Sequence, residues 1–297
     1  MVVLPGRLPP ADMYPAGEPG LRERFVRLAS GLTVRVVEAG APGAPPVVFV
    51  PGWACGAWIF HANIPALAKA GFHAMAVELK GHGLSDKPTS PAAYTLDSMR
   101  DHLLEILDAL ALPRAALAGH SMGAVIAAQA AAAAPDRVAG LALIAPVGFA
   151  GVRGMRLFRA LTPVRAVPLL ARISSRFLVW LMLVVVYRLR LPRGRDVDQF
   201  RAPTQFPEFA LALRHLLHEF DWESSLPHFA VPWMVVLGTR DHLSPVKDAS
   251  RYAGAHSSVV VPGAGHVILD EAPEKVNAAL AGFFGTVFGV GYISTDT

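Results

Sequence analysis

A serine stands between two glycines in the segment Leu117–Gly123, which reads LAGHSMG. A serine hydroxyl is a weak nucleophile unless a neighbouring base removes its proton. Two later segments supply suitable partners, Asp241 in GTRDHLSP and His266 in VPGAGH. An imidazole can accept the serine proton, and a carboxylate can orient the imidazole. These residue types predict nucleophilic catalysis by Ser121, with His266 as the base and Asp241 as the acid.

The elements around these residues must bring them together. Residues 115–118 end a predicted buried strand and Met122 begins a predicted helix, so that GHSMG is a tight strand-to-helix turn. Such a turn strains the backbone of its central residue and holds the hydroxyl at the top of the sheet, beside a helix N-terminus. The alternative interpretation is a tight turn with a capping serine. Asp241 and His266 each follow a predicted strand.

The whole chain alternates between predicted strands and helices. We predict strands at 24–30, 32–39, 47–50, 72–78, 114–118, 138–144, 233–237 and 258–261, and helices that include 57–70, 94–112 and 122–134. This alternation is typical of an α/β fold with a mostly parallel, doubly wound sheet. A helical, proline-punctuated, arginine-rich segment interrupts it. We therefore predict a core of residues 1–147 and 230–297 with a helical cap insertion at 148–229.

Several motifs resemble those of the α/β-hydrolase superfamily, from about residue 24 to 285 apart from the cap. GHSMG resembles the nucleophile elbow, and the chain order Ser121, Asp241, His266 is the order of that family. GHGLSDKP at 81–88 resembles the loop after the fourth strand. VPGW at 50–53 stands where the family carries its oxyanion loop, with Pro51 in place of the usual histidine. The resemblance implies an oxyanion hole formed by the backbone N–H groups of Trp53 and Met122.

The predicted function is a serine hydrolase, foremost a carboxylic-ester hydrolase that acts on a hydrophobic ester through an acyl-enzyme. The same triad also serves C–C bond hydrolysis, lactone hydrolysis, perhydrolysis and acyl transfer, and these alternatives stay open. Epoxide hydrolases and haloalkane dehalogenases resemble the chain in architecture, but they need a carboxylate nucleophile where Ser121 stands. A non-catalytic binding protein on the same scaffold is a further alternative. The proposed chemistry requires no metal or organic cofactor.

Other side chains are candidates for substrate binding or competing roles. The substrate-binding candidates are Trp53, His120, Phe149 and Phe158, with packing as the alternative for the last three. His120 is expected to pack and form hydrogen bonds rather than act as the base, and Cys55 to be a buried small hydrophobic residue. His215 and His218 have helical spacing but no evident third ligand, so no metal site is predicted. Asp270 and Glu271 are expected to complement a helix dipole.

The charge of the chain is unevenly distributed. The 297 residues carry a net charge of +4, and 53% of them are hydrophobic. Residues 149–195 contain ten arginines and no lysine, aspartate or glutamate. Three partners remain open for this segment: acidic residues of the core, an anionic substrate, or an anionic membrane surface contacted peripherally. Nucleic acid is not expected, because the basic residues are confined to one insertion without a recognition motif.

Localisation follows from the absence of particular signals. Cys55 is the single cysteine, so no intrachain disulfide forms. The first residues lack the apolar run of a secretory signal, and the apolar segment at 177–187 is shorter than the ~20 residues of a membrane-spanning helix. We expect a cytoplasmic protein, with a peripheral membrane location as the alternative. The oligomeric state stays open.

Overall fold

An eight-stranded sheet forms the centre of the computed structural model, which describes residues 6–149, 155–164, 167 and 175–290. The strand order is β1-β2-β4-β3-β5-β6-β7-β8. The strands are β1 (Arg22–Arg27), β2 (Thr33–Ala39), β3 (Pro46–Val50), β4 (His73–Val77), β5 (Ala115–His120), β6 (Val138–Ile144), β7 (Trp233–Gly238) and β8 (Ser257–Val261). Only β1–β2 and β2–β4 pair antiparallel. The prediction of a mostly parallel sheet is confirmed, and all eight predicted strands are present.

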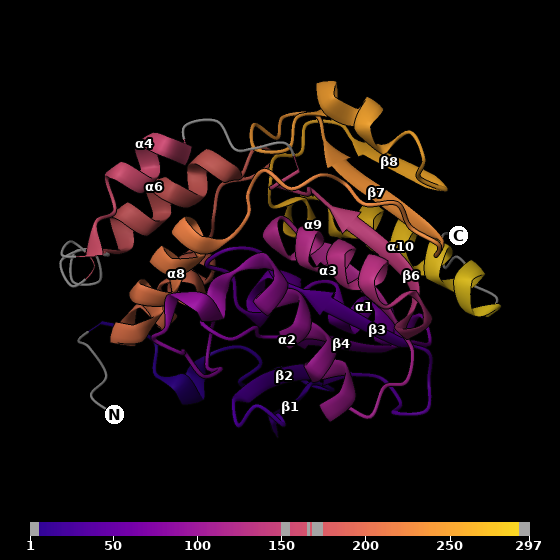
Figure 1. Cartoon of the computed structure of the whole chain (residues 1–297), viewed down its shortest axis with the longest axis horizontal. Helices are drawn as coiled ribbons and strands as arrows, with labels where there is room; N and C mark the ends of the chain where they lie inside the picture. The colour runs from indigo at the N-terminus through magenta and orange to yellow at the C-terminus, as the bar shows by residue number, and fades with distance from the viewer. Residues whose placement is uncertain (1–5, 150–154, 165–166, 168–174, 291–297) are drawn as a thin grey trace.

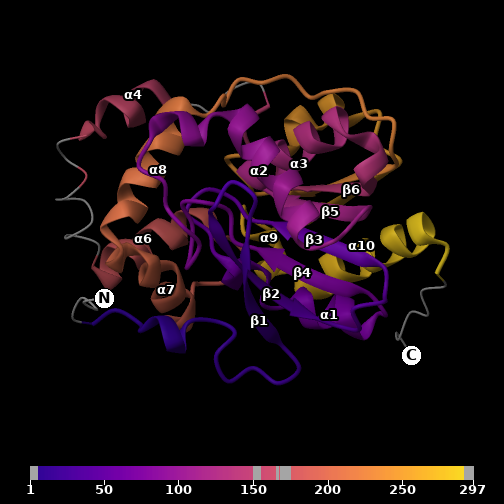
Figure 2. The ribbon, with the colours of Figure 1, turned by 60° about the horizontal axis from the view of Figure 1, so that its bottom comes forward.

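Helices cover both faces of this sheet (Figures 1 and 2). One apolar cluster joins alternate strand residues to α2 (Leu96–Ala109) and α3 (Met122–Ala133). A second joins the residues between them to α1 (Ile64–Lys69), α9 (Ile268–Glu271) and α10 (Pro273–Phe288). Successive side chains of a strand point to opposite faces, so a strand covered on both faces is apolar throughout. The predicted doubly wound architecture is therefore confirmed.

One predicted helix is split. The sequence pattern predicts a continuous helix over 57–70, whereas the structure has a 3₁₀ turn at Ala57–Phe60 and the short helix α1. Pro65 has no N–H group and is tolerated in the first turn of a helix but not in its interior. A helix at this place must therefore begin close to Pro65.

The described residues between β6 and β7 include the α-helices α4 (Met155–Ala160), α6 (Arg176–Val186), α7 (Gly194–Arg201) and α8 (Pro207–Glu219). Helices α4, α6 and α8 lie together at the left of Figure 1, and Figure 2 shows α7 beside α6. Strands β6 and β7 are nevertheless parallel neighbours. This arrangement supports the predicted cap at 148–229, whose boundaries remain a prediction. Within the described ranges, no helix is both long and apolar enough to cross a membrane.

Candidate active site

Ser121 lies in a strained turn between β5 and α3, with φ 56° and ψ −122°. A positive φ is uncommon for a residue other than glycine and often marks a functional site. The neighbouring chain is too close for side chains on either glycine. A Cβ on Gly119 would lie 2.4 Å from the carbonyl oxygen of Gly123, and one on Gly123 would lie 2.2 Å from that of Val50. The strand–turn–helix context expected for GHSMG is present.

The structure brings Ser121, His266 and Asp241 into one hydrogen-bonded chain. His266 Nε2 lies 2.9 Å from Ser121 Oγ, and His266 Nδ1 lies 2.9 Å from Asp241 Oδ2. The three side chains are buried. This is the geometry that transfers a proton from a serine to an imidazole held by a carboxylate.

Asp241 is held by more than the imidazole. Its Oδ1 accepts the backbone N–H groups of Leu243 at 2.8 Å and Ser244 at 3.1 Å. Burial by itself raises the pKa of this carboxyl, but His266 and the two N–H groups outweigh burial and hold the pKa below its usual value. Asp241 is therefore a fixed anion that faces the imidazole.

The loop that carries His266 is held on two sides. The backbone N–H of His266 donates to the carbonyl oxygen of Val186, at the end of α6, at 2.8 Å. Its carbonyl oxygen accepts a hydrogen bond from His120 Nε2 at 2.9 Å. Burial, together with the adjacent His266, lowers the pKa of His120 to about 3. His120 is thus a neutral donor that positions the His266 loop. The hydrogen bond between His266 and Val186 joins segments that are far apart in the sequence, and no sequence motif predicts it.

The predicted oxyanion loop packs directly on the serine turn. A Cβ on Gly52 would lie 2.9 Å from the Cβ of Ser121, so the chain before Trp53 passes beside the nucleophile. Met122 is the first residue of α3, and the N–H of a first helical residue has no partner within its helix. Both predicted donors therefore lie in segments next to Ser121. Their role as an oxyanion hole remains a prediction.

Glu78 supports this loop and was not predicted from the sequence. Its buried carboxylate accepts the backbone N–H of Ala57 at 3.0 Å and that of Leu84 at 2.7 Å. The Arg35 guanidinium lies 3.2 Å from this carboxylate and compensates its charge. The carboxylate thus joins the segment after β3 to the GHG turn. The signal that could have revealed it is an acidic residue at the end of a buried strand.

A cavity of about 480 Å³ opens above Ser121 and is lined almost entirely by apolar side chains of core and cap. Trp53 and Phe158 both line it, with their rings edge to face at 6.1 Å, and their role in substrate binding remains a prediction. The indole N–H of Trp53 also donates to the carbonyl oxygen of Leu213 in α8 at 3.0 Å, which anchors core to cap. His120 also lines the cavity. The cavity fits an apolar group attached to the reacting atom.

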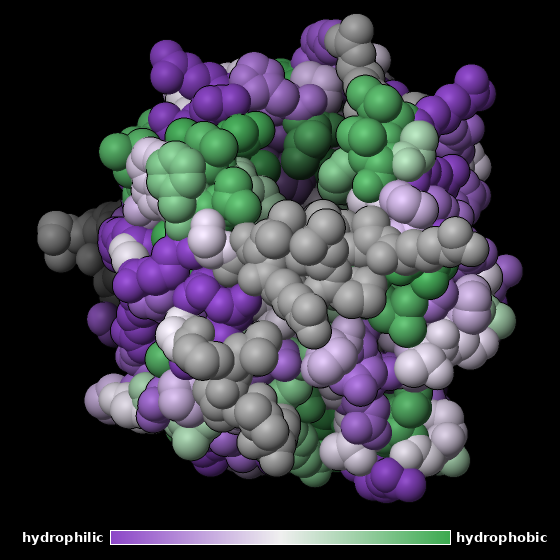
Figure 3. Space-filling model, turned by 90° about the vertical axis from the view of Figure 1, so that its left-hand side faces the viewer, coloured by the Kyte–Doolittle hydropathy of each residue, from purple (hydrophilic) through white to green (hydrophobic). Residues whose placement is uncertain are grey.

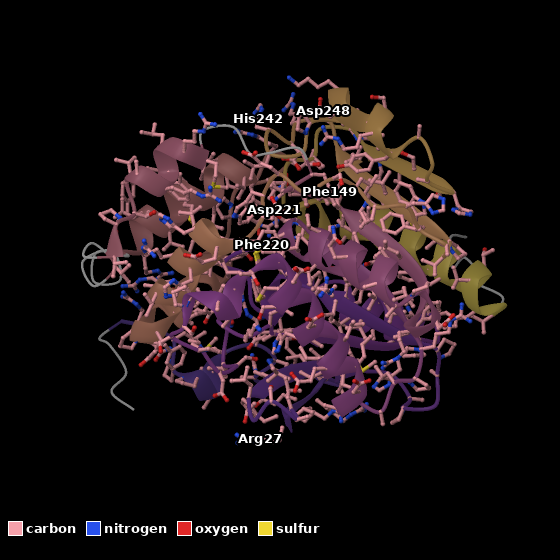
Figure 4. All side chains as sticks on the ribbon, viewed as in Figure 1. Arg27, Phe149, Phe220, Asp221, His242 and Asp248 are labelled. Carbon is pink, nitrogen blue, oxygen red and sulfur yellow. The ribbon has the colours of Figure 1, made fainter. Side chains whose placement is uncertain are left out.

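The prediction that Phe149 binds substrate is wrong for this cavity. Phe149 is 3% exposed and packs in the core cluster around α3. Phe149 instead lines a separate hollow, together with His242 and Asp248. Figure 4 labels these three residues. Phe149 follows Gly148 in the segment after β6, and its ring packs against the core.

The competing candidates have other partners. Burial raises the pKa of the Cys55 thiol to about 12, so it stays protonated. His215 stacks on Tyr94, and His218 Nε2 lies 3.3 Å from the Thr162 hydroxyl. No group of three His, Cys, Asp or Glu side chains suited to a metal is found among the described residues.

Asp270 and Glu271 lie in the first turn of α9, as expected for helix-dipole partners, and they also bind the cap. Asp270 accepts the Tyr187 hydroxyl at 2.7 Å and pairs with Arg190. Glu271 accepts the backbone N–H groups of Arg188 at 2.6 Å, Leu189 at 2.5 Å and Gly265 at 3.1 Å. Both carboxylates therefore tie the end of α6 to the helix that follows the His266 loop.

The arginines of the cap are partly compensated by acidic residues outside the 149–195 segment. Arg190 pairs with Asp196 and Asp270, Arg176 with Asp198, and Arg195 with Glu18. Asp270 and Glu18 belong to the core, so acidic residues of the core, one of the partners considered for these arginines, do pair with them. Arg153, Arg165 and Arg172 lie outside the described residues.

Comparison with known proteins gives consistent matches over most of the chain. A family model described as alpha/beta hydrolase fold matches residues 45–273. Epoxide hydrolase A of Mycobacterium tuberculosis is 29% identical, over 88% of this chain and 96% of that protein. The dihydrolipoyllysine-residue acetyltransferase component of the acetoin cleaving system of Pseudomonas putida is 33% identical, over 85% of this chain and 67% of that protein. The crystal structure of epoxide hydrolase A from Mycobacterium thermoresistibile matches with a TM-score of 0.71 at 27% identity, over 89% of this chain and 98% of that chain.

Proposed function

Because the chain belongs to the family of proteins with the alpha/beta hydrolase fold, we propose that it is a serine hydrolase that cleaves hydrophobic carboxylic esters. The observation that carries this proposal is the unbroken chain from Ser121 Oγ through His266 to Asp241. Ser121 and His266 line an apolar cavity. The activated hydroxyl supplies the nucleophile, and the cavity supplies binding energy for an apolar acyl or alcohol group.

The proposed reaction has two halves. Ser121 Oγ attacks the ester carbonyl while His266 takes its proton and Asp241 stabilises the resulting imidazolium. The N–H groups of Trp53 and Met122 receive the developing oxyanion, and removal of one such donor typically costs ~2.7–4 kcal/mol. The imidazolium then protonates the leaving alcohol. In the second half, His266 takes a proton from water, the hydroxide attacks the acyl-enzyme, and Ser121 is released with its proton restored.

Epoxide hydrolysis is the second candidate, because two of the similar proteins are named epoxide hydrolases. Opening an epoxide by the carboxylate route needs an aspartate where Ser121 stands. No Asp or Glu is found among the described residues that line the cavity. The oxygens of Asp241 are already held by His266 and by two backbone N–H groups. These contacts favour the ester proposal.

Acyl transfer uses the same acyl-enzyme and is the third candidate, because one relative is named an acetyltransferase. The difference lies only in whether water or another nucleophile attacks in the second half. An added alcohol that diverts the product from acid to ester would reveal it.

The test is hydrolysis of p-nitrophenyl esters from acetate to palmitate, with styrene oxide in parallel, by the wild type and by Ser121→Ala. We expect ester turnover that disappears in the variant. We also expect kcat/KM to rise about fourfold per added methylene until the cavity is filled, since burying one methylene contributes ~0.8 kcal/mol. Labelling of Ser121 by an aryl phosphonate provides an independent readout. Turnover of styrene oxide without ester turnover would refute the proposal.

A further inference from the structure

Helix α6 is apolar on every side but is covered on only one. Its sequence is RFLVWLMLVVV, and Val179 and Leu183 are its buried residues. Phe177, Leu181 and Val185, four residues apart, lie on the opposite side and are 46–66% exposed. Residues at this spacing share one face of a helix. A helix that is apolar all round is normally covered on all sides. Among the parts of the chain that the structure describes, no segment covers the outer face of α6 in this way.

This apolar surface continues to the mouth of the active-site cavity. Leu157, Phe158 and Leu161 near α4 and Met182 on α6 are exposed, and the same four side chains line the cavity above Ser121. The space-filling view of this side of the molecule shows large apolar areas beside a hollow (Figure 3). We call the surface formed by these four side chains and by Phe177, Leu181 and Val185 the cap face. An apolar path therefore runs from the cap face to the nucleophile.

The segments that carry the cap face are rich in arginine. Arg156 on α4 is exposed, and Arg176 at the start of α6 is exposed and pairs with Asp198 of α7 at 3.0 Å. No Asp or Glu occurs in residues 149–195. A second copy of the chain seated here by a two-fold axis would bring like charges together, because such an interface places the same patch on both sides. A lipid surface that carries negative charge complements the arginines and accepts the apolar side chains at the same time.

We propose that the cap face docks on an anionic lipid bilayer, with α6 lying in the plane of the surface. Its Phe177–Leu181–Val185 row enters the boundary between headgroups and acyl chains, and the arginines contact the headgroups. This docking goes beyond the proposed ester hydrolysis and does not depend on it. If that function holds as well, the mouth of the cavity opens toward the bilayer, and an apolar chain reaches Ser121 without crossing water.

Flotation with vesicles tests the docking separately from catalysis. The full chain carrying Ser121→Ala, which prevents turnover during the assay, is mixed with vesicles of phosphatidylcholine alone or with phosphatidylglycerol. We expect flotation with the anionic vesicles, weakened by added salt. The variant Phe177→Ser/Leu181→Ser/Val185→Ser should bind at least tenfold more weakly. A control, Phe25→Ser/Val260→Ser/Val290→Ser, removes apolar side chains elsewhere that are 39–52% exposed and should bind like its parent.

Three outcomes would overturn the docking proposal. The parent does not float with anionic vesicles at low salt, the α6 variant floats as well as the parent, or light scattering shows a dimer that the α6 variant abolishes. The last outcome would assign the cap face to a second copy. Circular dichroism, and p-nitrophenyl acetate turnover of the same triple variants with Ser121 restored, separate loss of docking from misfolding. Loss of ester turnover without loss of flotation would refute only the proposed function.

Discussion

At the scale of the residue, the two oxygens of Asp241 have different partners. Oδ1 accepts two backbone N–H groups, and only Oδ2 faces the imidazole. The carboxylate therefore accepts a hydrogen bond from His266 Nδ1–H, which leaves Nε2 without a proton and free to act as the base for Ser121. The tautomer of the base depends on this one oxygen.

Asp241→Asn should lower kcat of ester hydrolysis by about 10⁴-fold. The asparagine oxygen will keep the two backbone N–H groups, so its NH₂ group will face His266 Nδ1 and impose the wrong tautomer. The measurement is steady-state hydrolysis of a p-nitrophenyl ester. Asp248→Asn, on the same connection between β7 and β8, is the control and should keep wild-type kcat. A loss under tenfold in Asp241→Asn would show that Asp241 does not set the tautomer.

At the scale of the element, the helix α6 of the cap shapes the active site as well as covering it. Its final residue, Val186, accepts the backbone N–H of His266. Glu271 binds the two N–H groups that follow α6 and that of Gly265, directly before His266. A displacement of α6 would therefore move the base, so cap and catalysis are mechanically coupled.

Glu271→Gln should lower kcat about 10- to 100-fold with a small change in melting temperature, because a small misplacement of a catalytic group costs up to about 10²-fold. The neutral amide cannot accept three N–H groups as strongly as a carboxylate. Glu274→Gln is the control, since Glu274 is exposed in the first turn of α10. Equal kcat values for the two variants would contradict the coupling.

At the scale of the whole molecule, three histidines are buried in neutral form. Burial is the main cause that lowers the pKa of His82 to about 4 and those of His102 and His120 to about 3. In the unfolded chain the pKa of histidine is near 6.5. Below that pH the unfolded state binds protons that the folded state does not, so stability falls as the pH falls.

The free energy of unfolding should therefore decrease between pH 7.5 and 5, and His102→Gln should make this decrease shallower. One histidine contributes about 1.4 kcal/mol per pH unit once the pH is well below 6.5. The glutamine oxygen can still accept the Lys80 N–H that His102 Nε2 accepts at 2.9 Å. The measurement is urea unfolding across the pH range, with the exposed His242→Gln as control. Parallel curves for wild type and His102→Gln would contradict the assignment.

The local sequence determined the eight strands, the cover of helices on both faces of the sheet, and the turn that carries Ser121. These features depend on neighbouring residues: apolar runs bounded by glycine and proline, and two glycines around Ser121 where the backbone leaves no room for a Cβ. The identity of the triad was also accessible, because parallel strands end at one edge of the sheet and so bring Ser121, Asp241 and His266 together.

Only the tertiary structure decided which side chains surround that triad. Phe149 turns into the core, Val186 holds the base, and Asp270 and Glu271 face the cap. Likewise, α6 buries one apolar face and exposes the other, although its residues are almost uniformly apolar. The physical reason is the same in each case. These contacts join residues tens of positions apart or more, and no periodicity or motif within one segment specifies how a cap helix sits on a sheet.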